Sequence, residues 1–192
     1  MLYLFSTIVF TYLLASIPFG LVVAKVKKVD LRASGSGNIG ATNVYRAMGF
    51  KPALLVFALD AIKGFIPVYM ATQFFFDPSI HILIGIVAIA GHSLSIFVKF
   101  KGGKGAATGI GVLAALNPLA FCILFPLAVV IILTTRYVSV ATLTCSALAP
   151  LLLWLFNAPW EYSAFSAVAG LLIWIRHKAN IQRLIKGVEN KV

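Results

Sequence analysis

The chain has 192 residues, of which 61% are hydrophobic and only 11% charged, and its mean hydropathy is +1.00. A soluble domain of this length needs a far more polar surface, so the composition excludes one and predicts an all-α integral membrane protein. Sixteen basic residues against five acidic ones give a formal net charge of +11. In a membrane protein this excess indicates basic cytoplasmic loops that meet anionic lipids or substrates, not nucleic acid.

The chain begins with an apolar run over residues 3–24, which is long enough to cross a bilayer of about 30 Å. Pro18 and Gly20 near the inner end of this run predict a kink. Further apolar runs follow, each bounded by charged or turn-forming residues. The predicted spans after the first are residues 53–72, 80–98, 118–135, 138–156 and 162–175.

The apolar stretch from Gly105 to Leu116 is shorter than an ordinary span. We expect a short tilted helix there, which makes seven transmembrane helices within a single domain, residues 1–192. A six-span arrangement, in which residues 105–116 form one arm of a re-entrant hairpin, is the alternative. Both arrangements leave the charged loops on the same side of the membrane.

The positions of the basic residues predict the orientation. Fifteen of the sixteen lie in four segments, and seven crossings place all four segments on one face. By the positive-inside rule this face is cytoplasmic, so the N-terminus is expected outside and the C-terminus inside. The predicted cytoplasmic segments are the loops 25–52, 99–104 and 136–137 and the tail 176–192.

A segment from Ser34 to Arg46 interrupts the apolar pattern with small polar residues and no carboxylate. Glycine reaches left-handed conformations that point successive backbone N–H groups at one spot. The segment therefore predicts an anion-binding loop beside the membrane. Its candidate binding residues are Ser36, Gly37, Asn38, Gly40, Thr42, Asn43 and Arg46.

A second polar segment follows Gly91-His92, where two glycines lie between lysines at a predicted helix start. Bare N–H groups, the positive end of the helix dipole and two ammonium groups suit a phosphate. The residue order is not that of a Walker A loop. The alternative is a basic turn that holds lipid headgroups, with Gly105 and Gly109 packing against another helix. The candidate residues are Lys101, Gly102, Gly103, Lys104, Gly105 and Thr108.

The tail from Arg176 predicts an amphipathic helix, because apolar residues at 181, 184, 185 and 188 recur at helical spacing beside basic ones. His177 and Asn180 share a face on such a helix. They either contribute to a site or only cap and solvate the end of the last span. Ser139, just beyond Arg136, is a weaker candidate on the same side of the membrane.

Asp60 and Lys63 lie three residues apart within the span 53–72. Charges inside a membrane are costly and are usually paired or functional. We predict a structural ion pair that faces the helix bundle, with a proton or substrate path as the alternative. The residues in the cytoplasmic segments offer no set of metal ligands, so we expect no metal and no cofactor.

Three motifs stand in order along the chain: Ser34–Asn43 with Arg46, Gly91-His92 with Lys101–Gly105, and Arg176-His177 with Asn180-Ile181 and Arg183-Leu184. In this order, and in a chain of this size, they resemble the bacterial acyl-phosphate:glycerol-3-phosphate acyltransferases. The resemblance implies transfer of a fatty acyl group from acyl phosphate to the 1-hydroxyl of glycerol 3-phosphate, giving lysophosphatidic acid and phosphate. It also implies a site at the cytoplasmic face of a bacterial plasma membrane, with these two substrates and membrane lipid as partners.

The resemblance further implies roles for single residues. Ser36, Arg46, Lys104 and His177 are the expected catalytic residues, and the other motif residues, with Ser139 and Asn180, are expected to bind substrate. By family precedent the glycine-lysine motif holds mainly glycerol 3-phosphate. His177 is the best protein base by residue type, with a bound phosphate oxygen as its rival.

Two other functions fit parts of the pattern. A small transporter or channel for an organophosphate could use the same anion-binding loops, and it predicts a polar path through the bundle lined by Asp60 and Lys63. A lipid-binding assembly subunit would leave the glycine-rich loops unexplained. The sequence indicates neither the oligomeric state nor the preferred acyl-chain length.

Overall fold

The computed structural model describes residues 1–192 and contains helices without any β-strand, as the composition predicts. The chain divides into two compact units, Met1–Ala115 and Leu116–Val192. Five segments are long and apolar enough to cross a membrane: Leu2–Val26, Phe50–Phe74, Pro78–Val98, Pro118–Thr135 and Val138–Leu155. Two predicted spans are shorter helices, with 11 residues in Ala106–Leu116 and 17 in Trp160–Arg176.

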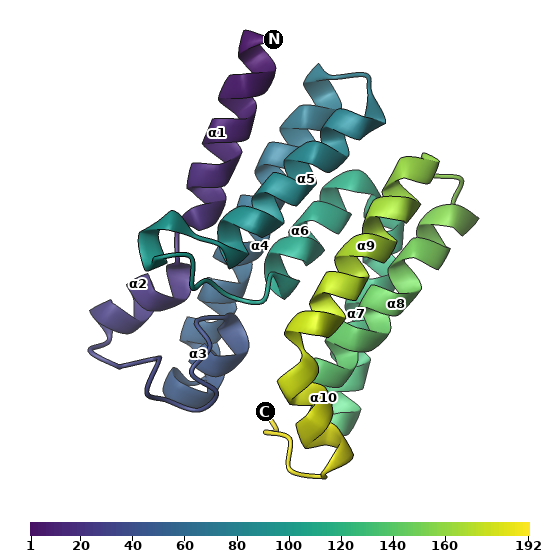
Figure 1. Ribbon diagram of the computed structural model, residues 1–192. Coiled ribbons are helices and arrows are strands. Elements are labelled where there is room, and N and C mark those ends of the chain that lie inside the picture. Colours follow the sequence, from purple (N-terminus) through teal and green to yellow (C-terminus); the bar gives the residue numbers. More distant parts are fainter. The chain divides into compact units, whose positions relative to one another are not determined.

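The first unit contains three long helical segments (Figure 1). The first consists of α1 (Leu2–Ser16) and α2 (Phe19–Val26), the second is α4 (Phe50–Phe74) and the third is α5 (Pro78–Ser93). Helix α5 packs against both α1 and α4. Three short helices complete the unit: α3 (Ala41–Met48), the 3₁₀ turn η1 (Ile96–Val98) and α6 (Ala106–Leu116), whose last residue belongs to the second unit.

The predicted kink in the first span is a complete break between α1 and α2. Proline lacks an N–H group and disfavours helical geometry in the residue before it, and Ile17 is accordingly extended. The carbonyl of Ile17 loses its helical partner, because the N–H of Leu21 donates to Pro18 instead. Two other donors reach this carbonyl oxygen: the N–H of Phe19 at 3.1 Å and Nζ of Lys63 on α4 at 2.8 Å.

The predicted basic loop 25–52 is only partly irregular, because α3 occupies its second half. Gly40 precedes the first helical residue in an extended conformation. A small buried cluster of apolar side chains packs this segment against α2 and α4. Its members are Ala24, Leu31, Ile39, Val44, Ala53 and Val56.

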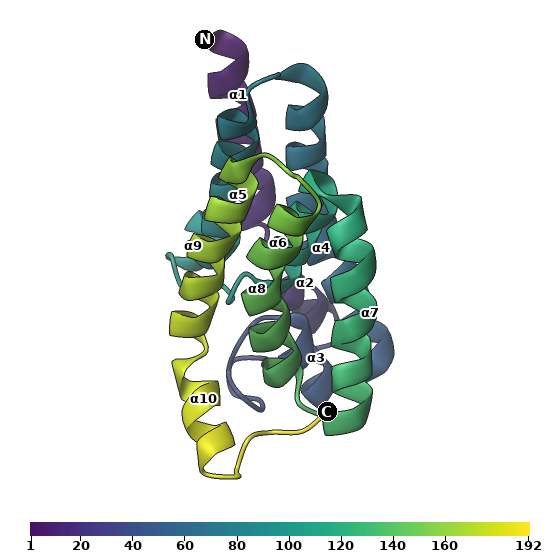
Figure 2. The ribbon, with the colours of Figure 1, turned by 90° about the vertical axis from the view of Figure 1, so that its right-hand side faces the viewer.

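The second unit contains α7 (Pro118–Thr135), α8 (Val138–Leu155), α9 (Trp160–Arg176) and α10 (Lys178–Ile185). Helix α8 packs against both α7 and α9. The predicted amphipathic tail helix is confirmed as α10, but a turn at His177 separates it from α9 (Figure 2). Ile185 on α10 is 81% exposed, which suits a helix that lies along a membrane surface.

Candidate active site

The first motif winds around the side chain of Asn43, which is only 1% exposed. Its Oδ1 accepts the backbone N–H of Ser36 at 2.8 Å. Its Nδ2 donates to the carbonyl oxygens of Leu31 and Ser34, each at 3.0 Å. Both donors of the Asn43 amide are therefore used to hold the loop, which makes this residue a support of the motif.

Two glycines allow the loop to close over Asn43. Gly35 and Gly37 have φ values of +54° and +68°, in the left-handed region that glycine adopts without strain. A Cβ at Gly35 would collide with the side-chain oxygen of Asn43. The same point lies 3.7 Å from Cδ of Arg46, so the stem of this arginine passes beside the loop. Arg46 and the exposed Ser36 thus belong to one local surface.

The remaining residues of the first motif surround the start of α3. Asn38 Oδ1 lies 3.4 Å from the backbone N of Gly40, and Thr42 is in the first helical turn. The N–H of Asn43 donates to the Gly40 carbonyl, but the N–H groups of the first two helical residues have no acceptor within the helix, so this end of α3 favours an anion. The motif therefore offers an arginine and a helix start, as an anion-binding loop requires.

The second motif differs from its prediction, which expected bare N–H groups at the glycine pair. The N–H of Gly102 donates to the carbonyl of Ser93 at 3.1 Å, and that of Gly103 to the carbonyl of His92 at 3.2 Å. A Cβ on Gly102 would collide with the His92 carbonyl, and one on Gly103 with the His92 ring. The glycines are needed for close packing, so any phosphate here would be held by Lys101 and Lys104 and by the start of α6.

Two further residues of this motif have different places. Gly105 has a φ of +84° and precedes the first residue of α6. Thr108 is fully buried, and its backbone oxygen and methyl group face Gly64 of α4. Thr108 thus lies in the packing interface between α4 and α6, which argues against the predicted contact with substrate.

A hydrogen bond joins the residues just before the first motif to the second motif. Arg32 Nη2 donates to the carbonyl oxygen of Lys101 at 3.1 Å. Arg32 lies just before the Ser34–Arg46 segment, so the two basic loops occupy the same end of this unit.

The predicted ion pair of Asp60 and Lys63 is confirmed, with Nζ 2.7 Å from Oδ1 and both residues 2% exposed. His92 was not predicted to take part, yet its Nδ1 lies 3.7 Å from the same carboxylate oxygen. The ring of His92 also packs against Gly103. A series of buried polar contacts through Lys63, Asp60 and His92 therefore connects the break in the first span to the second motif.

In the second unit, Glu189 joins the predicted site residues of the tail and α8. One carboxylate oxygen accepts from Asn180 Nδ2 at 2.6 Å and from Ser139 Oγ at 3.1 Å. The other accepts from Arg183 Nε at 2.6 Å. This single acid in the basic tail was not recognised in the sequence, where nothing links it to a serine 50 residues earlier.

The environment of Glu189 holds its carboxyl in the charged form. Burial alone raises the pKa of this carboxyl, but the hydrogen bonds from its three partners outweigh burial. The pKa of Glu189 therefore lies below its ordinary value. The charged Glu189 draws the end of the chain back against α8 and α10.

His177 is buried at the turn between α9 and α10. Its Nδ1 lies 2.8 Å from the carbonyl oxygen of Ile173. A carbonyl oxygen only accepts, so Nδ1 carries the hydrogen in this contact, and a neutral ring leaves Nε2 as its basic nitrogen. This arrangement suits a proton acceptor whose orientation the protein sets. No three histidine, cysteine or carboxylate side chains come together in a way that could hold a metal ion.

Comparison with known proteins gives a consistent result. The family model described as "Glycerol-3-phosphate acyltransferase" matches residues 5–187. A glycerol-3-phosphate acyltransferase of Aquifex aeolicus is 45% identical over 185 residues, covering 96% of both chains. Another, from Fusobacterium nucleatum, is 40% identical over 188 residues and 97% of both chains.

Solved structures give the same answer. The fold is similar, with a TM-score of 0.94 and 43% identity, to a crystal structure of "PlsY (YgiH), an integral membrane glycerol 3-phosphate acyltransferase" in its glycerol 3-phosphate form. The match covers 99% of this chain and 96% of the other. A second crystal structure of PlsY, in its lysophosphatidic acid form, has a TM-score of 0.91 at the same identity and covers 98% and 95% of the two chains.

Proposed function

The chain belongs to the glycerol-3-phosphate acyltransferase family, and from this premise we propose that it moves a fatty acyl group from acyl phosphate to the 1-hydroxyl of glycerol 3-phosphate. The products are lysophosphatidic acid and inorganic phosphate, in the synthesis of phospholipids. The observation that carries the proposal is the full-length similarity, in sequence and in fold, to relatives named for this acyl acceptor. The crystallised relative has forms with glycerol 3-phosphate and with lysophosphatidic acid.

The chemistry of the site fits two phosphate-bearing substrates. Both acyl phosphate and glycerol 3-phosphate are anions, and the four basic segments carry fifteen of the sixteen lysines and arginines. Such a surface attracts polyanions and raises their local concentration. Acyl phosphate also carries a hydrocarbon chain, which favours a site at the membrane surface.

In the proposed step, the hydroxyl oxygen of glycerol 3-phosphate attacks the carbonyl carbon of acyl phosphate, and the bond from that carbon to the bridging phosphate oxygen breaks. The hydroxyl proton passes to His177 Nε2 or to a phosphate oxygen, and inorganic phosphate leaves. Arg46 and Lys104 stabilise negative charge on the leaving phosphate and on the tetrahedral oxyanion. Because acyl phosphate is already activated, positioning and charge neutralisation supply most of the acceleration.

We assign one phosphate to each of the first two motifs. The Ser36–Arg46 segment grips its phosphate with Arg46 and the first turn of α3. The second motif uses the ammonium groups of Lys101 and Lys104, since the N–H groups of its glycines donate to the 92–93 backbone. Ser36, exposed beside Arg46, contributes to binding of the first phosphate. Asn180 stays a proposed substrate-binding residue, although its Nδ2 donates to Glu189.

The membrane arrangement is part of the same proposal. The chain crosses a bacterial plasma membrane seven times as a single domain, with the N-terminus outside and all basic segments in the cytoplasm. The short α6 and the 17-residue α9 supply the two crossings beyond the five long segments, the fourth and the seventh along the chain. The positive-inside rule supports this orientation, because it leaves no lysine or arginine on the outer face.

A transporter for an organophosphate is the weaker alternative. It needs Asp60 and Lys63 to line a polar path, but the two side chains are buried and bound to one another. Acyl transfer requires no such path.

Purified protein incubated with palmitoyl phosphate and radiolabelled glycerol 3-phosphate tests the proposal. We expect labelled lysophosphatidic acid and one inorganic phosphate for each molecule formed, with no product when acyl-coenzyme A replaces acyl phosphate. Absence of labelled lipid, together with uptake of label into proteoliposomes, would favour the transporter and overturn the enzyme.

The assignment of one phosphate to each motif predicts different losses in two variants. We expect both Arg46→Ala and Lys104→Ala to lower kcat/KM by at least about 100-fold, as removal of a charge-stabilising group does. Each should raise KM for a different substrate. Steady-state kinetics with each substrate varied in turn measures this, and Lys51→Ala, at an exposed lysine of α4, is the matched control. Full activity of either variant contradicts the two-phosphate assignment.

The proposed base predicts a loss in kcat rather than in binding. His177→Ala should lower kcat by about 100-fold or more, the contribution of a positioned base, with KM for glycerol 3-phosphate little changed. Lys178→Ala, at the exposed neighbouring position, should retain activity. Near-normal kcat in His177→Ala would assign the proton to a phosphate oxygen instead.

A further inference from the structure

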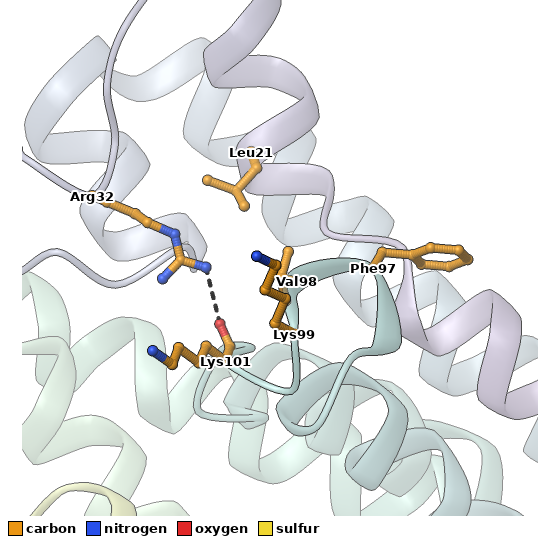
Figure 3. A pocket seen from close by; sticks show the side chains of 6 residues that line it. All are labelled: Leu21, Arg32, Phe97, Val98, Lys99 and Lys101. Carbon is orange, nitrogen blue, oxygen red and sulfur yellow. Dashed lines mark hydrogen bonds between the residues drawn. The ribbon is translucent and has the colours of Figure 1, made fainter.

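The first unit contains an open pocket of about 450 Å³ beside the first two motifs (Figure 3). Two segments far apart in the sequence form most of its wall, the Ile96–Val98 turn with the residues after it and the end of the first span. The lining residues are Leu21, Arg32, Phe97, Val98, Lys99 and Lys101. Half of them are basic and half are apolar.

The charge in this pocket has one sign. Arg32, Lys99 and Lys101 line it without any acidic residue. The nearest acid along the chain, Asp30, directs Oδ1 to the backbone N–H groups of Arg32 and Ala33, at 3.0 and 3.2 Å, and so caps the turn that carries Arg32. Three cations without a carboxylate among them repel one another unless an anion lies between them.

The backbone also holds Lys99 in a conformation that its residue type disfavours. Lys99 and Phe100 have φ values of +53° and +61°, in the left-handed region where long side chains are uncommon. Two such residues in succession are strained, and strain of this kind gathers at ligand sites. The hydrogen bond from Arg32 Nη2 to the carbonyl of Lys101 holds the loop in place from the opposite wall.

The pocket lies where two spans end. Leu21 belongs to the last turns of the Leu2–Val26 segment, and Phe97 and Val98 close the Pro78–Val98 segment. The side chains of Ile96 and Phe97 are more than half exposed at this level. Basic groups above an exposed apolar surface match the boundary between phosphate headgroups and acyl chains.

We propose that this pocket binds an anionic phospholipid of the surrounding bilayer, with Arg32, Lys99 and Lys101 around the phosphate group and the acyl chains along Leu21, Phe97 and Val98. None of the proposed catalytic residues Ser36, Arg46, Lys104 or His177 lines the pocket. Lys101 is shared with the proposed phosphate site of the second motif, so the pocket adjoins the reaction site without containing any of these catalytic groups. The bound lipid is a partner of the enzyme, not its substrate.

The test compares two lysines of similar exposure in the same unit. Lys99→Asn removes one cation from the pocket and suits the left-handed backbone, which asparagine adopts more readily than lysine. Lys27→Gln removes one exposed cation that does not line the pocket. Native mass spectrometry of the detergent-purified protein, titrated with phosphatidylglycerol or with phosphatidylcholine, measures binding of each lipid. Unfolding temperatures of both variants confirm that they are folded.

We expect the unaltered protein to bind phosphatidylglycerol more tightly than phosphatidylcholine, in a manner that salt weakens. Lys99→Asn should weaken phosphatidylglycerol binding about five-fold, the loss that one basic residue near a membrane surface implies, while Lys27→Gln should not. A second variant, Arg32→Gln, should show a similar loss. Equal losses in Lys99→Asn and Lys27→Gln would overturn the pocket as the site. Equal binding of the two lipids would overturn the recognition of negative charge. Displacement of phosphatidylglycerol by millimolar inorganic phosphate would assign the pocket to free phosphate and overturn the lipid.

Discussion

The amide of Asn43 makes three hydrogen bonds to backbone groups that lie between seven and twelve residues before it in the chain. Only a neutral amide offers one acceptor and two donors from a short side chain, so an aspartate cannot replace it. The sequence suggested a substrate-binding residue at this position, because Asn43 lies in the polar segment that is predicted to bind an anion. Asn43 is buried because the folded loop brings the carbonyls of Leu31 and Ser34 to its amide, which the sequence alone does not indicate.

This arrangement predicts a large loss of stability in Asn43→Ala. The substitution removes the Asn43 partner of the Ser36 N–H and of the Leu31 carbonyl, while the Ser34 carbonyl still accepts from the N–H of Gly37. We expect the free energy of unfolding to fall by about 2 kcal/mol, roughly 1 kcal/mol for each of the first two groups. Thermal unfolding in detergent measures the change. Asn38→Ala, which loses one long contact at 3.4 Å, is the matched control and should change stability little. Equal stability of both variants would mean that the loop does not depend on Asn43.

The N–H groups of Gly102 and Gly103 are occupied, unlike in the prediction. The composition of the glycine pair and its flanking lysines predicted free N–H groups, and the lysines remain candidates for a phosphate. The N–H groups themselves are satisfied by the carbonyls of Ser93 and His92, which lie about ten residues earlier across a turn. No spacing rule in the sequence pairs these groups, so the prediction failed for a contact that only the folded chain creates.

At the scale of elements, the sequence located the long helices and the break at Pro18, because length, hydropathy and proline act locally. It missed α3, since this helix is short, has Thr42 and Asn43 in its first turn inside a glycine-rich segment, and packs Val44 into the buried apolar cluster. It predicted the tail helix from periodicity but missed the turn at His177. A helix that is stabilised mainly by tertiary contacts cannot be recognised from its local sequence pattern.

Glu189 with its hydrogen-bond partners Ser139, Asn180 and Arg183 forms a clamp on the tail. Its contribution to the free energy of unfolding should depend on pH. The carboxyl of Glu189 has a pKa below its ordinary value, so its stabilising effect is complete above the unfolded-state value of about 4.3 and is lost as the pH falls through the lower folded-state value. We expect Glu189→Gln to lower the free energy of unfolding by about 2 kcal/mol at pH 7, because hydrogen bonds to a charged group weaken. The difference from the unaltered protein should shrink below about pH 4.

Thermal unfolding at several pH values provides this measurement. Glu161→Gln, at an acid in the first turn of α9 outside the clamp, serves as the control and should show no comparable effect at neutral pH. A stability difference for Glu189→Gln that stayed constant down to pH 3 would show that its charge is not what holds the tail.

At the scale of the whole molecule, seven crossings require two helices of unusual length. A helix of 11 residues spans only about 16 Å at 1.5 Å per residue, roughly half of the hydrocarbon core. Length and hydropathy alone therefore identify five spans, and the other two depend on the distribution of charge. The positions of lysine and arginine are given directly by the sequence, so the orientation and the two shorter crossings stay predictions that rest on the positive-inside rule.

The orientation predicts opposite labelling of two positions. In a background with Cys122 and Cys145 replaced by alanine, we expect Phe76→Cys to react with a membrane-impermeant maleimide in intact spheroplasts. Phe76 is fully exposed, at 104%, between α4 and α5. Lys178→Cys, in the basic tail, should react only after the membrane is permeabilised. The reverse pattern would invert the topology and place the proposed site outside the cell.

The break at Ile17–Pro18 also bears on how the protein is made. When only the first span has left the ribosome, the carbonyl of Ile17 accepts only from the nearby N–H of Phe19, since its second donor Lys63 has not yet been synthesised. The charge of Lys63 in turn depends on Asp60, three residues earlier in the same helix. The second span thus carries its ion pair within one helix and adds a charged donor to the carbonyl at the break in the first. This contact between the two spans can form only after both have entered the membrane.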